Sequence, residues 1–107
     1  MVNFDEIFDS IKSGFEDLAK TTLSDLNDVA VEDAYVFLTK TKNDLMNWTE
    51  QLAEKKINQT EFELNVRGQK ELAECVLLKK AGLAEIEVDK FQTGIMNIII
   101  NTVLKLI

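Results

Sequence analysis

The chain has 107 residues, of which 46% are hydrophobic and 29% are charged, a balance that argues against disorder and fits one folded domain spanning residues 1–107. It contains no proline and only four glycines, too few turn residues for a β-rich or loop-rich fold. The formal net charge of −7 disfavours nucleic acid as a partner, because an acidic surface repels phosphate groups. We therefore expect an all-α protein.

The negative charge is concentrated at the start of the chain. Residues 1–33 contain nine acidic residues and two lysines, which accounts for the entire net charge, whereas acids and bases balance over residues 34–107. A solvent-exposed helix face is the usual explanation of such a stretch, and it is the one we favour. The alternative is a docking surface for a basic protein partner.

The first half of the chain has the pattern of one long amphipathic helix. Apolar or small residues recur at steps of three or four from Phe8 to Leu52, which predicts a single helical stripe. Asn27 and Asp28, followed by two β-branched valines, are the candidate interruption. They lower helix propensity without requiring a break.

A helix start signal lies at the middle of the chain. Asn58 is a favourable N-cap residue, and the Glu61 side chain can accept a hydrogen bond from the Asn58 N–H, which makes a capping box. Ile57 and Phe62 occupy the two positions of a hydrophobic staple, which sets the direction from which the chain enters the helix. The pattern predicts a turn near residue 57 and a new helix after it.

The second half of the chain is also helical in its periodicity. Apolar residues recur at helical spacing from Phe62 to Leu106, with a gap at Gln69 and Lys70. Glycine costs about 1 kcal/mol relative to alanine inside a helix, so Gly82, directly after Ala81, is the main candidate for a kink or break.

Two helical arms joined near residue 57 predict a long antiparallel two-helix hairpin. Each arm of about fifty residues would be about 75 Å long, at a rise of about 1.5 Å per residue. The turn would place residue i roughly opposite residue 115 − i, which brings large apolar residues together near the termini. The alternative is a single-chain four-helix bundle with breaks near residues 27 and 82. We favour the hairpin because neither break carries a signal as strong as the one at Asn58.

The C-terminal segment, residues 95–107, is too apolar for one facing helix to cover. A helix that is apolar over most of its circumference is normally enclosed on several sides. Homo-oligomerisation, with a dimer favoured, is our preferred explanation. The alternatives are burial within a single-chain bundle and reversible contact with a membrane surface or a hydrophobic ligand. The polar residues form one narrow seam at Thr93, Asn97, Asn101 and Lys105.

These patterns predict a non-enzymatic structural or protein-interaction protein that self-associates as a helical-bundle oligomer through its apolar terminal half. A hydrophobic or a basic protein is the other class of partner that we consider. The alternative function is a peripheral membrane or hydrophobic-ligand-binding protein that uses the C-terminal amphipathic helix. The residues expected to form the interface are Phe8, Ile11, Phe15, Phe91, Ile95, Ile98, Ile99, Val103 and Leu106.

The sequence offers little catalytic chemistry. It contains no histidine, which removes histidine-dependent nucleophile activation, acid–base catalysis and metal ligation. We identify no phosphate-binding glycine loop and no zinc-binding cysteine cluster, and we expect no cofactor and no metal. The single cysteine, Cys75, fits a reducing compartment, and we find neither a signal peptide nor a membrane-spanning segment, so we expect a cytoplasmic location.

Overall fold

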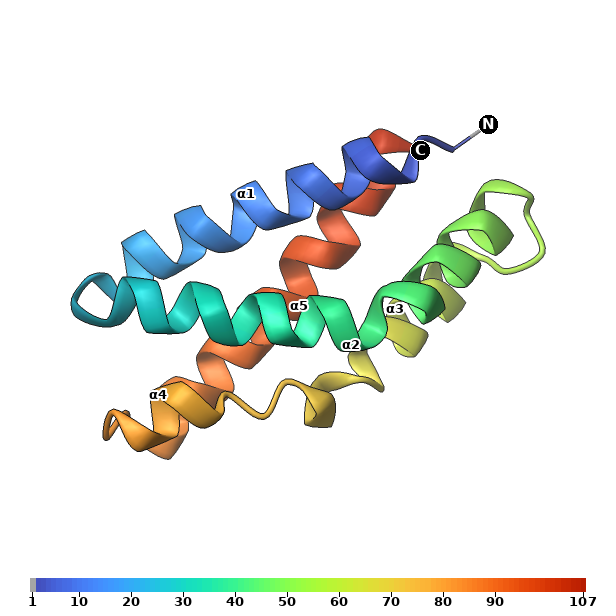
Figure 1. The fold of residues 1–107 in the computed structure, drawn as a ribbon. Helices are drawn as coiled ribbons and strands as arrows, with labels where there is room; N and C mark the ends of the chain where they lie inside the picture. Colours follow the sequence, from blue (N-terminus) through green and yellow to red (C-terminus); the bar gives the residue numbers. More distant parts are fainter. Residues whose placement is uncertain (1) are drawn as a thin grey trace.

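The computed structural model describes residues 2–107 and confirms that the chain is all-helical (Figure 1). The α-helices are α1 (Phe4–Thr22), α2 (Asn27–Ala53), α3 (Gln59–Arg67), α4 (Val76–Lys80) and α5 (Glu85–Leu106). Two short 3₁₀ turns, η1 (Ser24–Leu26) and η2 (Lys70–Leu72), lie in the connections after α1 and α3.

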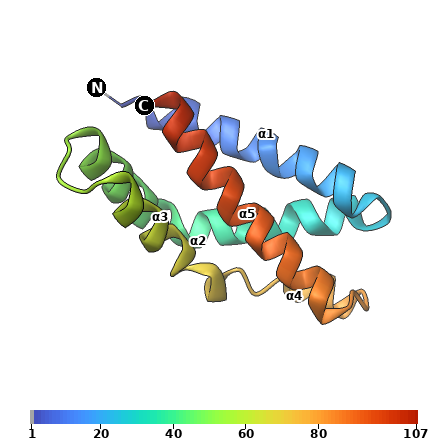
Figure 2. The same cartoon turned by 180° about the vertical axis from the view of Figure 1, so that it is seen from behind.

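The helices pack into one compact bundle. α1 and α2 form an antiparallel pair, and α5 runs back along α1 while crossing α2 on one side (Figures 1 and 2). α3 lies against the end of α2 and against α5, and α4 packs on α2 near its start. The first described residues and the C-terminus lie beside each other at one end of the bundle (Figures 1 and 2).

The structure contradicts the uninterrupted arms of the predicted hairpin. The longest dimension of the molecule is 43 Å, well short of the expected rod of about 75 Å. The first arm is interrupted at Leu23, whose backbone leaves helical geometry at φ −136° and ψ 51°, and it resumes as α2. Just before it, the Thr21 and Thr22 hydroxyls donate to the carbonyl oxygens of Asp17 and Leu18, a back-bonding pattern that bends helices.

The second arm is broken twice. One break falls at residues 81–84, where Gly82 adopts φ 89°, and agrees with the predicted interruption at Ala81 and Gly82. The other separates α3 from α4 and was not predicted, although the gap at Gln69 and Lys70 lies within it. The alternative of a four-helix bundle anticipated the bends near residues 27 and 82, and the observed bundle differs from it in having its third helix split into α3 and α4.

The predicted turn near residue 57 is confirmed, together with its capping box. The Glu61 N–H donates to Asn58 Oδ1 at 2.8 Å, and the Asn58 N–H donates to Glu61 Oε1 at 3.0 Å. Phe62 is fully buried, and Ile57 packs against the same core, as a hydrophobic staple requires. Lys55 takes the left-handed conformation at φ 62° that ends α2.

The α1–α5 contact is close because each helix carries a glycine at the crossing. A Cβ atom added to Gly14 would lie 2.7 Å from Ile98 Cγ2, and one added to Gly94 would lie 2.9 Å from Leu18 Cδ2. Both pairs follow the antiparallel register in which residue i lies opposite residue 112 − i. The register expected from the sequence for the terminal ends therefore differs from the observed one by three residues, slightly less than one helical turn.

Candidate functional site

Most of the residues predicted to form an oligomer interface lie in the core of the chain itself. Phe8 and Ile98 are half-buried, and Leu106 is 38% exposed. The apolar circumference of α5 is covered by α1, α3, α4 and η2, which is the arrangement that we considered as an alternative to oligomerisation. α5 therefore needs no second molecule to cover most of its apolar surface. The six fully buried residues are Ile11, Phe15, Phe91, Ile95, Ile99 and Val103.

The polar seam of α5 faces outward, as its sequence pattern suggests. Asn97, Asn101 and Lys105 are exposed, while Thr93 is half-buried. The Arg67 guanidinium donates to Asn97 Oδ1 at 2.9 Å, so the seam also carries a polar contact to the end of α3. Most other apolar residues of α5 are buried or half-buried in the bundle, and the exceptions are Ile86 and Leu106, which are 65% and 38% exposed.

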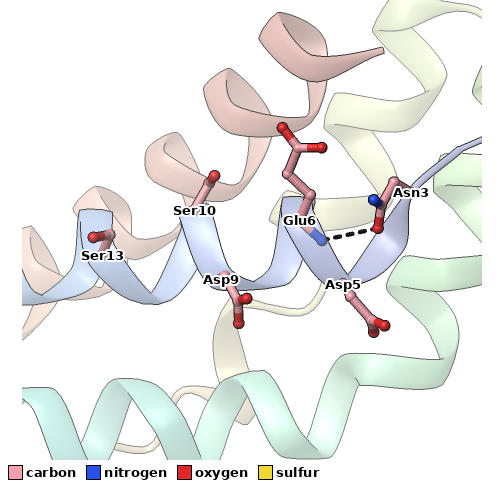
Figure 3. A pocket seen from close by; sticks show the side chains of 6 residues that line it. All are labelled: Asn3, Asp5, Glu6, Asp9, Ser10 and Ser13. Carbon is pink, nitrogen blue, oxygen red and sulfur yellow. Dashed lines mark hydrogen bonds between the residues drawn. The ribbon is translucent and has the colours of Figure 1, made fainter.

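The strongest surface feature is an acidic face on the first half of α1. An open hollow there is lined by Asn3, Asp5, Glu6, Asp9, Ser10 and Ser13 (Figure 3). In the view of Figure 3, Asp5 and Asp9 lie along one edge of this exposed face, and Glu6 and Ser10 lie along the other edge. The carboxylates therefore spread along a ridge of the helix instead of converging on one point.

The local structure explains part of this acidic composition. Asn3 is the N-cap of α1, and its side chain accepts a hydrogen bond from the Glu6 N–H at 3.1 Å. Asp5 and Glu6 lie in the first turn, where negative charge interacts favourably with the helix dipole. Asp9 lies beyond the first turn and has no such structural role. It extends the negative surface along the helix.

The acids of this face are not neutralised by neighbouring lysines. Among residues 2–107, the ion pairs involve Lys40, Lys56, Lys70 and Lys90, and none of them reaches Asp5, Glu6 or Asp9. The Lys12 ammonium instead lies over the rings of Phe8 and Tyr35, at 5.2 Å and 5.8 Å from their centroids.

Aromatic and charged side chains link α1 to α2. The Tyr35 hydroxyl donates to Glu16 Oε1 at 2.6 Å, and this hydrogen bond, together with partial burial and the Glu16 charge, raises the pKa of Tyr35 to about 12. Lys42 lies over the Phe8 ring at 5.0 Å from its centroid. Lys12, Lys42 and Glu16 therefore take part in the packing of α1 against α2.

Asp33 has a buried carboxylate, although it belongs to the acidic stretch for which a solvent-exposed face was expected. Its two oxygens accept hydrogen bonds from the N–H groups of Leu77 and Leu78, at 3.2 Å and 2.8 Å. Asp33 is 7% exposed, and it lies on α2 whereas its donors open α4. The signal for this role was its place on the apolar stripe, between Ala30 and Phe37.

Cys75 lies directly before α4 and is 4% exposed. Burial raises the pKa of its thiol to about 11; the nearby Asp33 charge adds to the rise, and Lys79 opposes it. The thiol is therefore protonated near neutral pH, as expected for a small buried hydrophobe rather than an activated nucleophile.

Over the described range, 2–107, no cluster of three or more cysteine or acidic side chains has the geometry to hold a metal ion. Within the same range, no helix is both long enough and apolar enough to cross a bilayer. No protein-family model, curated protein or solved structure matches this chain, so its functional assignment rests on its own residues.

Proposed function

We propose that this protein is a non-enzymatic protein-interaction module, and that its binding surface is the acidic face of α1 formed by Asp5, Glu6 and Asp9. The partner is a basic protein. The observation that carries the proposal is that these three carboxylates lie within five residues of one helix, are exposed, and form no ion pair with any residue of the described range 2–107.

An unpaired acidic surface on a rigid helix suits electrostatic recognition. Its field attracts a basic surface over about 8 Å at physiological ionic strength and raises the association rate. The helix is held in place by the buried residues of its opposite face, Ile7, Ile11, Phe15 and Ala19, so the carboxylates need no reorganisation of the backbone on binding.

A non-catalytic role is supported by the protonation states of the candidate reactive groups. Tyr35 and Cys75, the two side chains with raised pKa values, both stay protonated near neutral pH and are weak nucleophiles in that form. A reducing, cytoplasmic environment remains our proposal for a chain whose one cysteine is a buried free thiol.

Two charge-matched variants test the location of the binding surface. The first is Asp5→Asn, Glu6→Gln and Asp9→Asn on α1. The second, made at exposed acids of α2, is Glu32→Gln, Asp44→Asn and Glu50→Gln. Affinity capture from cell extract, followed by quantitative mass spectrometry, should find a basic protein that binds the native chain and the α2 variant but not the α1 variant. This protein should be released by 0.5 M salt, because the screening length then falls to roughly 4 Å. Equal capture by both variants would contradict the proposal.

Self-association at the terminal end is the second candidate function. Leu106 and Ile107 are 38% and 47% exposed, and the half-buried Phe4 and Phe8 rings pack together on α1, whose start lies at the same end of the bundle (Figure 1). This apolar end supports a weaker, reversible contact than the helical-bundle oligomer expected from the sequence. Sedimentation velocity from micromolar to millimolar concentration tests it, since a purely monomeric 12.2 kDa species throughout would rule it out.

A further inference from the structure

The connection between α3 and α5, residues 68–84, is built differently from the rest of the bundle. It contains the three-residue turn η2 and the five-residue helix α4, and such short helices are not stable without tertiary contacts. We call these residues the strap. The strap lies along α2 and against the start of α5 (Figures 1 and 2).

Few apolar side chains anchor the strap. Ala73, Cys75 and Leu78 are its fully buried residues, whereas Leu72 and Val76 are 40% and 44% exposed. A segment with so little buried apolar surface has a lower free energy of opening than the helices beside it.

Polar contacts hold the strap to both neighbouring helices, but most of them lie at the surface. Lys40 pairs with Glu74 at 3.4 Å and Lys70 with Asp89 at 2.6 Å, and in both pairs the acid side chain is more than half exposed. Exposed pairs of this kind contribute little to stability. The Gln92 side-chain amide also donates to the carbonyl oxygen of Ala73, in a part-buried position.

The contact with Asp33 is buried, unlike these ion pairs. It supplies the hydrogen-bond acceptors that a side-chain N-cap of α4 would otherwise provide. The N-cap position of α4 is Cys75, whose side chain makes no capping hydrogen bond and whose backbone is held in the left-handed conformation at φ 50°. The Asp33 carboxylate on α2 accepts the N–H groups of Leu77 and Leu78 instead. A charged acceptor with one buried and one part-buried hydrogen bond contributes more than either exposed ion pair.

We propose that the strap opens as a unit while the α1–α2–α5 core stays folded. The hydrogen bonds that the Asp33 carboxylate accepts determine the free energy of this opening. Opening separates Leu77 and Leu78 from Asp33, relieves the left-handed backbone at Cys75, and uncovers Cys75, Leu78 and the surface of α2 beneath α4. The strap is thus a conformational device within the fold, independent of the acidic face of α1.

The thiol of Cys75 provides a direct probe, because it is the single cysteine of the chain and is buried when the strap is closed. A thiol reagent such as DTNB, added to the native protein, should label Cys75 at a rate set by opening. At low urea concentrations, the free energy of opening derived from this rate should depend on urea much less steeply than the free energy of global unfolding. Far-UV circular dichroism measures global unfolding on the same samples.

Replacement of Asp33 by alanine should accelerate labelling roughly 10- to 100-fold, because both capping bonds to a charged group are lost. Asp33→Asn retains one acceptor oxygen and should give an intermediate rate. The matched control is Glu32→Ala, at the exposed neighbouring acid of α2, which should change the rate less than about two-fold.

Two results would overturn the proposal. One is a labelling rate for the native chain that depends on urea concentration as steeply as global unfolding does, which would show that the strap does not open separately. The other is an unchanged labelling rate in the Asp33→Asn variant. Both remain measurable if Asp33→Ala does not fold, since the first uses the native sequence and the second retains one hydrogen-bond acceptor.

Discussion

Replacement of Gly14 by alanine tests the α1–α5 crossing, the contact that distinguishes the observed bundle from a rod. The new Cβ would lie 2.7 Å from Ile98 Cγ2, a branch attached directly to the Cβ atom of Ile98, so the helices themselves must move apart. Overpacking of this kind costs about 1–3 kcal/mol, and alanine returns about 1 kcal/mol of helix propensity. We expect a net loss of about 1 kcal/mol in the free energy of unfolding.

Gly94→Ala is the matched control on the facing helix. Its added Cβ meets Leu18 Cδ2 at 2.9 Å, but that atom is the far end of a flexible side chain and can turn aside. The helix-propensity gain of up to about 1 kcal/mol is then kept, so this variant should be at least as stable as the native chain.

A double-mutant cycle with Ile98→Ala isolates the clash. Removal of Cγ2 relieves the overpacking, so Gly14→Ala combined with Ile98→Ala should be more stable than the sum of the two single losses by about 1 kcal/mol or more. Urea unfolding followed by circular dichroism gives all four stabilities. Additivity within about 0.5 kcal/mol, or stabilisation by Gly14→Ala alone, would refute the close contact and with it the observed register.

The remaining predictions concern the core, an ionisation and the capping box. Ile99→Asp places a charge in the core and should unfold the chain with a loss of at least about 3 kcal/mol; sedimentation together with circular dichroism would show a folded monomer if Ile99 belonged to an interface instead. Tyr35 is the single tyrosine, so absorbance at 295 nm should report its ionisation near the raised pKa of about 12, and nearer its ordinary value in Glu16→Gln. Because the pKa is higher in the folded state, this contact stabilises the fold fully below about pH 10 and is lost as the pH rises towards 12. Asn58→Ala should lower the free energy of unfolding by about 1 kcal/mol, read from the urea midpoint, and Asn58→Gly by a few tenths.

The structure confirms the features whose causes are local in sequence. The capping box at Asn58 and Glu61 depends on residues three apart, and the break at Gly82 depends on the backbone freedom of one glycine. The outward polar seam of α5 follows from helical periodicity alone. The contact between large residues near the two termini could also be predicted, because the apolar stripes of the first and second halves of the chain both carry bulky side chains there.

The bend at residues 23–26 could not be decided in the same way. The propensity difference between a continuous helix and a broken one at Thr21, Thr22 and Leu23 amounts to tenths of a kcal/mol per residue, which packing elsewhere easily exceeds. Bending lets α5 lie against α1, α3 and α4, so its apolar circumference is covered within one chain. The apolar pattern of α5 indicated that it must be covered, but homo-oligomerisation was favoured over burial within one chain as the source of that cover.

The role of Asp33 was likewise visible in the sequence only in part. Its position on the apolar stripe of α2 was visible, but its acceptor role depends on N–H groups 44 and 45 residues away in the chain. The amino-acid pattern by itself determined that the chain is helical, where its central turn lies, and which faces of the helices are apolar, because these depend on neighbours within a turn or two. Tertiary packing decided whether the helices bend at residues 23–26 and between α3 and α4, and what covers α5, because those outcomes balance small local costs against the burial of large apolar surfaces.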